Sequence, residues 1–565
     1  MKAIHILLSI AALWVAMPIF AAKQAQQPIV RANFEDIVYI IDEKAKTAIV
    51  DVSPKQGGDI DIPEVIPVND VDYTVIGIGD KAFKGWKNLE SVSLPPTIKT
   101  VYRSAFEGTA FFKDTLNWNH GELYIDSILI AVCPDSCKTK YKIRPGTTVI
   151  AVGALIDCKT VTQIWIPKSV EEIAPYTFKN HKNLRKFHIG SGVKRIGKEA
   201  FMGTAAWENE GNWKKGILYI DTCIIAANAA VKPNCVIKPE SRLIAEGAFL
   251  NNPTLYSINI PARIREIPDE AFCGCSELGK ITMPAHITRI GKLAFADCQS
   301  LKYFSFPAEL KEIGMQAFSG CIALQSVKLP DGIKELPDGV FYRCLALGTI
   351  SHWPNAIREI GMGAFRDCSQ LLEIKQLPIT LKKIGKGCFS GCTSLQEVTL
   401  PDSLISIPAH CFDGCMNLQS CKISDAVYDI DNYAFRGCIK LESFKMPTFL
   451  FRMGEYAFMG CSDLKYFRLS DYTQVIEKGA FMGCTNIEKI DIPLRTQTIE
   501  SQVFSGCKLL REVNFHSDLK LIEQAAFENC TLLKKVFLPE GAEVHPNAFG
   551  KDNKLTKINF VEVKK

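Results

Sequence analysis

The sequence predicts an α/β, strand-rich solenoid built from about 19 repeats of a 23-residue unit. Three observations predict this fold class. A phenylalanine, usually preceded by alanine, returns every 23 residues, with two steps of 24. A cysteine often follows it three residues later, and a short apolar alternation ending in proline precedes the next unit. A fixed period of roughly 20–50 residues is typical of one supersecondary unit stacked on itself.

The phenylalanine positions give the repeats their register, and we expect their rings to lie over one another in a continuous inner column. The main series is Phe249, Phe272, Phe295, Phe318, Phe341, Phe365, Phe389, Phe412, Phe435, Phe458, Phe481, Phe504 and Phe527. The remaining anchors are Phe83, Phe106, Leu155 (in place of Phe), Phe178, Phe201 and Phe549. Because each unit of a solenoid contacts only its neighbours, a chain of 565 residues need not divide into several globular domains. Such a fold has an extended surface and no single deep cleft, which favours a binding protein.

Residues 1–22 are typical of a secretory signal peptide. Lys2 supplies a positive charge, residues 4–20 are apolar, and Ala21 and Ala22 offer a small-residue cleavage site. A membrane anchor is the alternative, but this apolar run is shorter than the ~20 residues of a spanning helix. We therefore expect an exported protein that is secreted, periplasmic or on the cell surface of a bacterium. We expect no transmembrane segment after the signal is removed.

Residues 23–75 lack the repeat but contain strand-like runs at residues 37–41 and 73–76. A terminal repeat needs a cap over its open face. We therefore expect residues 23–75 to form an N-terminal capping β segment and residues 76–565 to form the solenoid. Residues 554–565 add a last apolar alternation.

One repeat shows how the unit should fold. In residues 301–306 apolar and polar side chains alternate, as in a strand with one buried face. Pro307 has no N–H to donate and should end the strand. Ile313 and Gly314 should turn the chain, and a short helical or 3₁₀ turn should follow up to Cys321. Stacked repeats would place a parallel sheet on one face and these turns on the other.

Two long gaps interrupt the phenylalanine series, from Phe106 to Leu155 and from Phe201 to Phe249. Both contain a matching segment, Gly-Glu-Leu-Tyr-Ile-Asp at 121–126 and Gly-Ile-Leu-Tyr-Ile-Asp at 216–221, followed by a second apolar run. We expect a β-hairpin inserted in each gap, near residues 110–135 and 205–230.

The repeat can be written L-x-x-I-x-I-P-x-x-(I/V)-x-x-I-G-x-x-A-F-x-x-C. It resembles the BspA-type leucine-rich repeat of surface proteins from host-associated bacteria and some protists. The match covers roughly residues 76–565, and the segment from Phe34 to Val75 resembles the lead-in of those proteins. The resemblance implies a leucine-rich-repeat solenoid and an adhesin-like role, in which the protein binds extracellular-matrix proteins or other cells.

Thirteen of the 21 cysteines lie three residues after an anchor position. They are Cys158, Cys275, Cys298, Cys321, Cys344, Cys368, Cys392, Cys415, Cys438, Cys461, Cys484, Cys507 and Cys530. Side chains stacked in successive turns point the same way, which is poor disulfide geometry, so we expect buried free thiols. The disulfide candidates lie elsewhere: Cys133 with Cys137, and Cys223 with Cys235. No ligand spacing supports a metal site.

The remaining sequence features argue against catalysis and against nucleic-acid binding. A formal charge of +5 is small for this length. The sequence contains no G-x-S-x-G, H-E-x-x-H or P-loop motif, and its histidines have no recurring nucleophile or acid partner. We therefore expect a non-enzymatic protein with no cofactor, no metal and no catalytic residues, acting as a monomer.

One basic row stands out on the solvent face of the predicted sheet. Lys422, Lys445 and Arg468 occupy equivalent positions in three consecutive repeats, so their Cα atoms should lie roughly 5 Å apart. Tyr466 and Lys489 border them. A negatively charged ligand, either an acidic glycan or an acidic protein patch, is one interpretation. Lysines that keep an exposed sheet soluble are the other.

The sequence leaves three functional hypotheses. The first is a secreted or cell-surface binding protein, adhesin-like, which recognises an extracellular protein or acidic glycan, including host matrix, through its repeat surface. The second is a structural scaffold of the envelope without a specific ligand. The third is a carbohydrate-active enzyme, whose carboxylate pair would have to come together only in the fold.

Overall fold

The computed structural model describes residues 30–54, 58–375, 377–465, 467–550 and 557–561. The expected signal peptide at 1–22 lies outside the described residues. The chain forms two compact units. Unit 1 is the chain up to Val193 together with Ala200–Ala205, and unit 2 is Lys194–Glu199 together with Ala206–Lys565. The expected boundary between cap and solenoid at residue 75 stays a prediction.

Unit 1 begins with a mixed sheet in the order β1-β2-β3-β6-β5, with β8 paired to β6. Its strands are β1 (Val30–Phe34), β2 (Ile37–Asp42), β3 (Thr47–Val50), β5 (Val65–Val68), β6 (Val71–Ile78) and β8 (Thr100–Val101). The short strands β4 (Gly58–Asp61) and β7 (Leu89–Ser93) pair in parallel beside it. Strand β6 pairs antiparallel with β5 and parallel with β8, so it joins the irregular start to the first repeats.

The two expected hairpin insertions are confirmed, and they are copies of one module. In unit 1, β10 (Glu122–Ile125) pairs antiparallel with β11 (Ile128–Val132). In unit 2, β19 (Ile217–Ile220) pairs antiparallel with β20 (Cys223–Ala227). The preceding short elements are η1 (Arg103–Ala105), α1 (Ala110–Lys113), η2 (Thr115–Asn117) and β9 (Trp118–Asn119) in the first case, and α2 (Ala205–Glu208), η4 (Glu210–Asn212) and β18 (Trp213–Lys214) in the second.

Equivalent contacts hold each insertion. The indole Nε1 of Trp118 donates to the carbonyl of Phe112 at 2.9 Å, and that of Trp213 donates to the carbonyl of Trp207 at 2.8 Å.

After the first hairpin come η3 (Pro134–Ser136), β12 (Lys140–Lys142), β13 (Val149–Ile150), β14 (Gln163–Ile166), β15 (Glu172–Ile173) and β16 (Lys186–Ile189).

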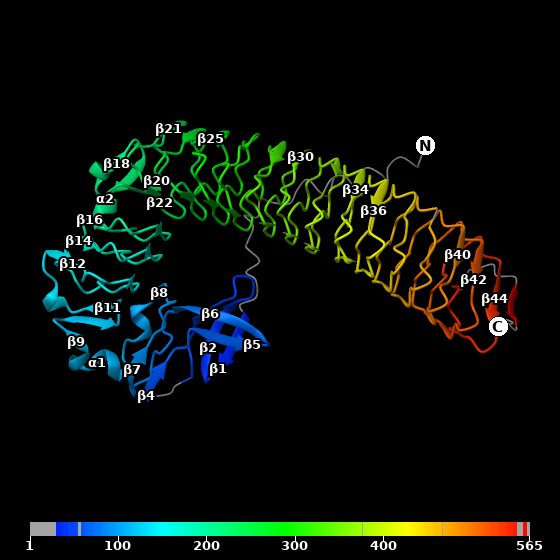
Figure 1. The fold of residues 1–565 in the computed structure, drawn as a ribbon, viewed down its shortest axis with the longest axis horizontal. Coiled ribbons are helices and arrows are strands. Elements are labelled where there is room, and N and C mark those ends of the chain that lie inside the picture. Colours follow the sequence, from blue (N-terminus) through cyan, green and yellow to red (C-terminus); the bar gives the residue numbers. More distant parts are fainter. Residues whose placement is uncertain (1–29, 55–57, 376, 466, 551–556, 562–565) are drawn as a thin grey trace, which may run out of the picture. The chain divides into compact units, whose positions relative to one another are not determined.

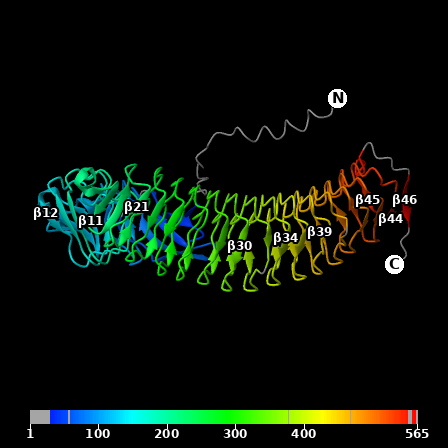
Figure 2. The ribbon, with the colours of Figure 1, turned by 90° about the horizontal axis from the view of Figure 1, so that it is seen from above.

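Unit 2 is a stack of turns with two parallel strand ladders (Figures 1 and 2). The ladder of longer strands, the first sheet, comprises β21 (Asn234–Val236), β23 (Ser257–Asn259), β25 (Lys280–Thr282), β28 (Ser326–Lys328), β30 (Thr349–His352), β32 (Glu373–Ile374), β34 (Glu397–Thr399), β36 (Ser420–Lys422), β40 (Lys489–Asp491), β42 (Glu512–Asn514), β44 (Lys535–Pro539) and β46 (Lys557–Val561). Neighbouring strands pair in register, with Ile258 opposite Ile281, as the 23-residue period requires.

A second ladder of mostly two-residue strands, the second sheet, occupies the position at which the sequence predicted only a turn. It comprises β17 (Arg195–Ile196), β22 (Leu243–Ile244), β24 (Glu266–Ile267), β26 (Arg289–Ile290), β27 (Glu312–Ile313), β29 (Glu335–Leu336), β31 (Glu359–Ile360), β33 (Lys383–Ile384), β35 (Ser406–Ile407), β37 (Asp429–Ile430), β38 (Arg452–Met453), β39 (Val475–Ile476), β41 (Thr498–Ile499), β43 (Leu521–Ile522) and β45 (Glu543–Val544). Each of these strands up to β43 buries only one apolar side chain, so the sequence shows no alternation there.

Tight turns take the place of the expected helical segments around each column phenylalanine. Among the described residues of unit 2, helices occur only in the hairpin insertion. Gln316, two residues before Phe318, has φ of 55°, and Gly437, two residues after Phe435, has φ of 71°. Left-handed residues on both sides of the phenylalanine interrupt any helix, and they explain the frequent glycine before the cysteine.

The glycine of the Ile-Gly pair has a different role, because the backbones of adjacent turns meet there. A Cβ atom on Gly314 would lie 2.3 Å from the backbone nitrogen of Lys292 in the preceding turn. Any larger residue would force the turns apart, so this glycine sets the closeness of the stack.

The column phenylalanines form the continuous inner stack that the sequence predicted. From Phe249 to Phe549 each ring stacks on the next, with ring centroids 5.1–5.7 Å apart. The rings from Phe249 to Phe527 are fully buried. Offset aromatic contacts at this spacing add to the free energy gained by burying the rings.

We call the cysteines three residues after an anchor position the ladder cysteines. Twelve of the thirteen, from Cys275 to Cys530, are free, fully buried and hydrogen-bonded. Each Sγ donates to the carbonyl of the phenylalanine one turn earlier, at 3.0–3.4 Å. Burial raises the pKa of Cys275 to about 12, and raises that of Cys368 well above its ordinary value of 9.0. These thiols are packing groups that each satisfy a backbone acceptor.

The expected disulfides are corrected by the structure. Cys137 is bonded to the ladder residue Cys158, with their Cα atoms 5.4 Å apart, whereas Cys133, Cys223 and Cys235 are free. Cys137 and Cys158 lie 21 residues apart, which places them in adjacent turns. Cys133 is separated from Cys137 by η3, and Cys223 and Cys235 lie in different sheets.

Candidate functional site

The predicted basic row lies where the first sheet is interrupted. Lys422 ends β36 and Lys489 begins β40, and both are exposed. Lys445 and Arg468, in the turns between them, are exposed but lie in extended segments outside the assigned strands. Tyr466 lies outside the described residues. The structure therefore brings four of the five residues to one face, on a less regular backbone than the sequence suggested.

Carboxylates of the protein already neutralise most of this row. The Nζ atom of Lys445 lies 2.8 Å from Asp425, Arg468 lies 3.4 Å from Asp471, and Lys489 lies 2.6 Å from Glu512. The hydrogen bond from Lys445 lowers the pKa of Asp425, and that from Lys489 lowers the pKa of Glu512. An external anion would compete with these internal partners, so the row is a weaker anion site than its residue types suggest.

Two shallow hollows flank Arg468. One, of about 440 Å³, is lined by Phe467, Arg468, Glu488, Lys489 and Asp491 among others. The second, of about 280 Å³, lies between Lys445, Met446 and Tyr472. Both mix cationic and anionic side chains. They can hold water or a small polar group, but they do not select one sign of charge.

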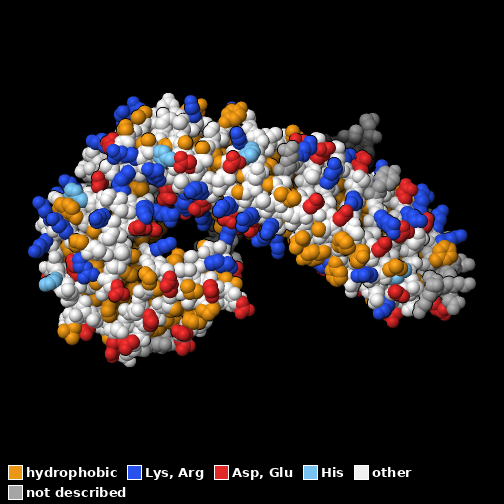
Figure 3. All heavy atoms as spheres, viewed as in Figure 1, with side chains coloured by type: hydrophobic (Ala, Val, Ile, Leu, Met, Phe, Trp, Pro, Cys, Tyr) orange, Lys and Arg blue, Asp and Glu red, His pale blue; other side chains and the backbone are white. Residues whose placement is uncertain are grey.

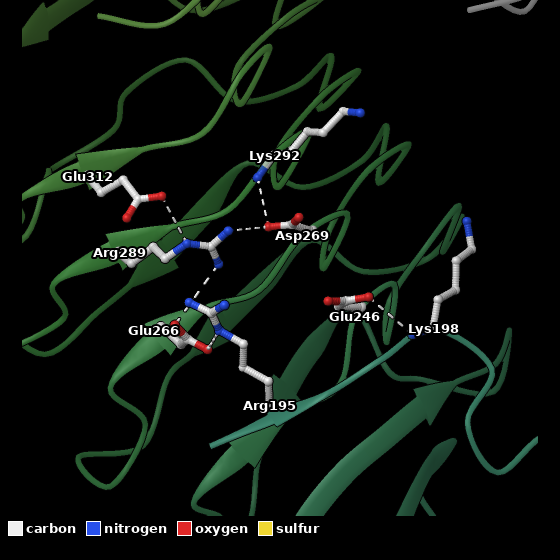
Figure 4. A network of polar contacts seen from close by, with 8 residues as sticks. All are labelled: Arg195, Lys198, Glu246, Glu266, Asp269, Arg289, Lys292 and Glu312. Carbon is white, nitrogen blue, oxygen red and sulfur yellow. Dashed lines mark hydrogen bonds and ion pairs between the residues drawn. The ribbon is translucent and has the colours of Figure 1, made fainter. Parts of the chain in front are cut away.

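The second sheet carries an ion-pair network of its own, drawn in Figure 4. The guanidinium of Arg289 lies 2.6 Å from Asp269, 3.1 Å from Glu312 and 4.0 Å from Glu266. Burial alone would lower the pKa of Arg289, but these three carboxylates more than offset it and the pKa is raised. Only 18% of this side chain is exposed. Because its partners Glu266 and Glu312 lie in the turns before and after it, the network joins three successive turns.

A second basic series, which sequence reasoning missed, runs beside this network. We call the residues seven positions before each column phenylalanine the corner column. From Phe272 to Phe389 its members are Arg265, Thr288, Lys311, Lys334, Arg358 and Lys382, and the five basic ones are all exposed. Backbone hydrogen bonds link successive members, as from Lys311 to Thr288 at 2.9 Å and from Lys382 to Arg358 at 2.8 Å.

The cations of the corner column lack the compensation found in the sheet-face row. Within the described residues none of the five forms an ion pair. The neighbouring carboxylates Glu312 and Glu359 are already bound to Arg289 and Lys383. Glu335, in the same strand ladder, is exposed. The signal for this surface was present in the sequence as a basic residue at one fixed repeat position.

The same column becomes apolar in the next three turns, at Ile405, Tyr428 and Phe451. These side chains are 52, 49 and 43% exposed, and Phe449 and Tyr472 beside them are 54 and 43% exposed. We call these five residues the apolar ledge. Figure 3 shows Lys and Arg side chains along the lower edge of the green part of unit 2, and hydrophobic side chains gathered along the lower edge of its yellow part.

No cluster of metal-ligating side chains and no helix long and apolar enough to cross a membrane occurs in the part of the chain that the structure describes. The features that stand out are therefore extended and lie on the surface: one compensated row, one uncompensated column and one apolar ledge.

Comparison with known proteins identifies the class. The parallel turns, the buried phenylalanine column and the Ile-Gly corner define a leucine-rich-repeat solenoid. A model of the BspA-type leucine-rich repeat region, six copies long, matches residues 69–126, 242–372, 358–475 and 451–565. The chain therefore belongs to the BspA-type leucine-rich repeat family.

Several solved structures of leucine-rich repeat proteins match the chain. A leucine-rich repeat protein from Bacteroides ovatus is 22% identical, with 94% of this chain and 100% of that one covered and a TM-score of 0.33. A leucine-rich cell-surface protein from Faecalibacterium prausnitzii is 19% identical, with 86 and 94% covered and a TM-score of 0.28. A leucine-rich repeat protein from Eubacterium ventriosum is 19% identical, with 61 and 92% covered and a TM-score of 0.37. No curated protein matches the chain.

Proposed function

We propose that this protein is an exported, adhesin-like recognition protein that binds an extracellular protein or acidic glycan through its repeat surface. Membership of the BspA-type family supports a binding role, because such repeats form an extended scaffold for interactions. The proposal includes host matrix proteins among the ligands, and a monomer that needs no cofactor and binds no nucleic acid.

One observation carries the proposal: basic side chains recur in the corner column with no ion-pair partner among the described residues, although the fold does not need them. Cations in adjacent turns lie roughly 4.8 Å apart and repel one another. Thr288 shows that a neutral residue fits the same position. A repulsive arrangement that the fold does not require is typical of a surface that meets an oppositely charged partner.

A binding panel tests this function. The mature chain from Lys23 would be exposed to immobilised matrix proteins and acidic glycans at low and at physiological salt. We expect saturable binding to at least one of them, weakened by salt because screening shortens the reach of exposed charges. Absence of binding to the whole panel at both salt concentrations would contradict the proposal.

A structural scaffold of the envelope is the second candidate, and the sheet-face row favours it. There Lys445 and Lys489 pair with Asp425 and Glu512, as expected for a surface that only stays soluble. A scaffold protein would bind no member of the panel and would cofractionate with the cell envelope. Hydrolysis of a polysaccharide panel would instead support a carbohydrate-active enzyme.

A further inference from the structure

The corner column changes character once along its length, and this change distinguishes it from a simple charged surface. Basic residues occupy the corner position in five of the six successive turns from Arg265 to Lys382. Apolar residues occupy it in the next three turns, from Ile405 to Phe451. Backbone hydrogen bonds continue through the apolar part, from Tyr428 to Ile405 at 3.0 Å and from Phe451 to Tyr428 at 2.8 Å. The two parts form one line, because Phe389 and Phe412, the column rings of the turns at their junction, stack at 5.6 Å.

The apolar ledge widens this line at one end. Phe449 and Tyr472 lie next to it with their ring centroids 5.4 Å apart, and the guanidinium of Arg495 lies 4.8 Å from the ring of Tyr472. Five large apolar side chains, each 43–54% exposed, gather there. Contiguous exposed apolar side chains of this kind mark interaction surfaces, whereas single ones do not.

We propose that the corner column and the apolar ledge bind an extended protein segment that carries an acidic stretch followed by apolar residues. The proposal rests on the binding function proposed above and names the surface and the partner. Charge complementarity assigns the acidic stretch to Arg265–Lys382, and hydrophobic burial assigns the apolar residues to the ledge. Nine turns are separated by eight steps of roughly 4.8 Å, which span about 38 Å, the length of about 12 residues in an extended chain.

A protein segment fits this surface better than an acidic glycan. Ile405, Tyr428 and Phe451 offer hydrocarbon surface, and the nearby polar pair Asp429 and Arg452 is already joined at 2.9 Å. Sugar hydroxyls placed over Ile405, Phe449 and Phe451 would lose hydrogen bonds to water without gaining replacements, which costs free energy. Apolar side chains of a peptide would gain from the same contact.

The test uses the mature chain and a fluorescent 12-residue peptide, seven glutamates followed by Phe-Leu-Gly-Phe-Leu. A scrambled peptide of the same composition and the acidic glycan heparin are the comparison ligands. The first variant reverses charge in the corner column (Lys311→Glu, Lys334→Glu, Arg358→Glu). Its matched control makes the same change of net charge on the sheet face (Lys422→Glu, Lys445→Glu, Lys489→Glu). A third variant removes the ledge (Tyr428→Ser, Phe451→Ser). These residues are exposed, and circular dichroism checks that each variant folds.

We expect the corner-column variant to weaken peptide binding at least tenfold, the ledge variant about fivefold, and the sheet-face control less than twofold. The scrambled peptide should bind at least fivefold more weakly than the ordered one. Equal losses from the two charge-reversed variants would overturn the proposal, because binding would then follow net charge alone.

Other occupants would give different results. Preference for heparin, unaffected by the ledge variant, would assign the surface to a glycan and overturn the proposal. Residues 30–80 carry eleven acidic and four basic residues. Salt-sensitive self-association that the corner-column variant abolishes, without peptide binding, would therefore assign the surface to a second copy. If the mature chain does not bind the peptide but still binds a member of the panel, only this inference is wrong. If it binds neither, the proposed function is wrong as well.

Discussion

At the scale of single residues, each repeat position has its own physical reason. Phe365 fills the inner column, Cys368 satisfies a carbonyl of the preceding turn, and Gly314 permits close contact between turns. The sequence predicted the phenylalanine and cysteine roles, because both recur at a fixed period. It did not predict the Cys137–Cys158 disulfide, since the first insertion hides the fact that these residues lie in adjacent turns.

Truncating one ring of the column should strongly destabilise unit 2. Phe365→Ala removes a fully buried ring that stacks on Phe341 and Phe389 at 5.4 and 5.5 Å. We expect the free energy of unfolding to fall by about 3–5 kcal/mol. Denaturant unfolding measures it, with Tyr303→Ala, a side chain 66% exposed, as the control that should change by less than about 0.5 kcal/mol. Equal effects of the two changes would refute the buried column.

At the scale of elements, unit 2 is a set of columns, some buried and some exposed. The sequence predicted the first sheet from its apolar alternation but missed the second, because Glu312–Ile313 contributes one buried side chain and looks like a turn. It also missed the corner column, since exposed charges follow no hydrophobic pattern. Lys422 and Lys445 could be placed from the sequence because they alternate with buried residues in the predicted strands. Only the folded chain shows which cations are already paired.

The thiol column predicts a loss of stability at alkaline pH. Burial raises the folded-state pKa of thiols such as Cys344 and Cys368 well above the ordinary value of 9.0, and raises that of Cys275 and Cys530 to about 12. Above pH 9 the unfolded chain loses thiol protons that the folded chain keeps, which favours unfolding. The stability that the protonated thiols contribute is therefore present below pH 9 and is lost as the pH rises toward the folded-state pKa. Each thiol should cost about 1.4 kcal/mol per pH unit between pH 9 and its folded pKa.

Urea unfolding at pH 8, 9 and 10 measures this loss. The variant Cys321→Ala, Cys344→Ala, Cys368→Ala should lose stability less steeply with pH, by about 4 kcal/mol per pH unit for the three thiols together. An unchanged slope would show that the thiols do not control the alkaline transition.

The paired and unpaired cations should differ in their effect on stability. Lys334→Gln removes an exposed cation that repels its neighbours, so the free energy of unfolding should stay the same or rise by a few tenths of a kcal/mol. Arg289→Gln removes the centre of a network with three carboxylates and should cost about 1.5–3 kcal/mol. Thermal or urea unfolding of the two variants compares them. A larger loss for Lys334→Gln would mean that the corner column stabilises the fold.

At the scale of the whole molecule, the repeat explains how a long chain presents a linear surface. Each added turn extends the same core and carries one more residue of every exposed column, so a pattern of basic and apolar side chains about 38 Å long needs no special backbone. The buried phenylalanine column thus fixes the register, and the register places the corner column in a line.

A lysine footprint tests the central claim, that ligands bind along the corner column. The mature chain is acetylated briefly with and without a partner captured from the binding panel, and the modified lysines are measured by mass spectrometry. Lys311, Lys334 and Lys382 should be protected at least threefold by the partner, while Lys422 and Lys445 on the sheet face keep their reactivity. Protection of Lys422 and Lys445, with the corner column unchanged, would contradict the account.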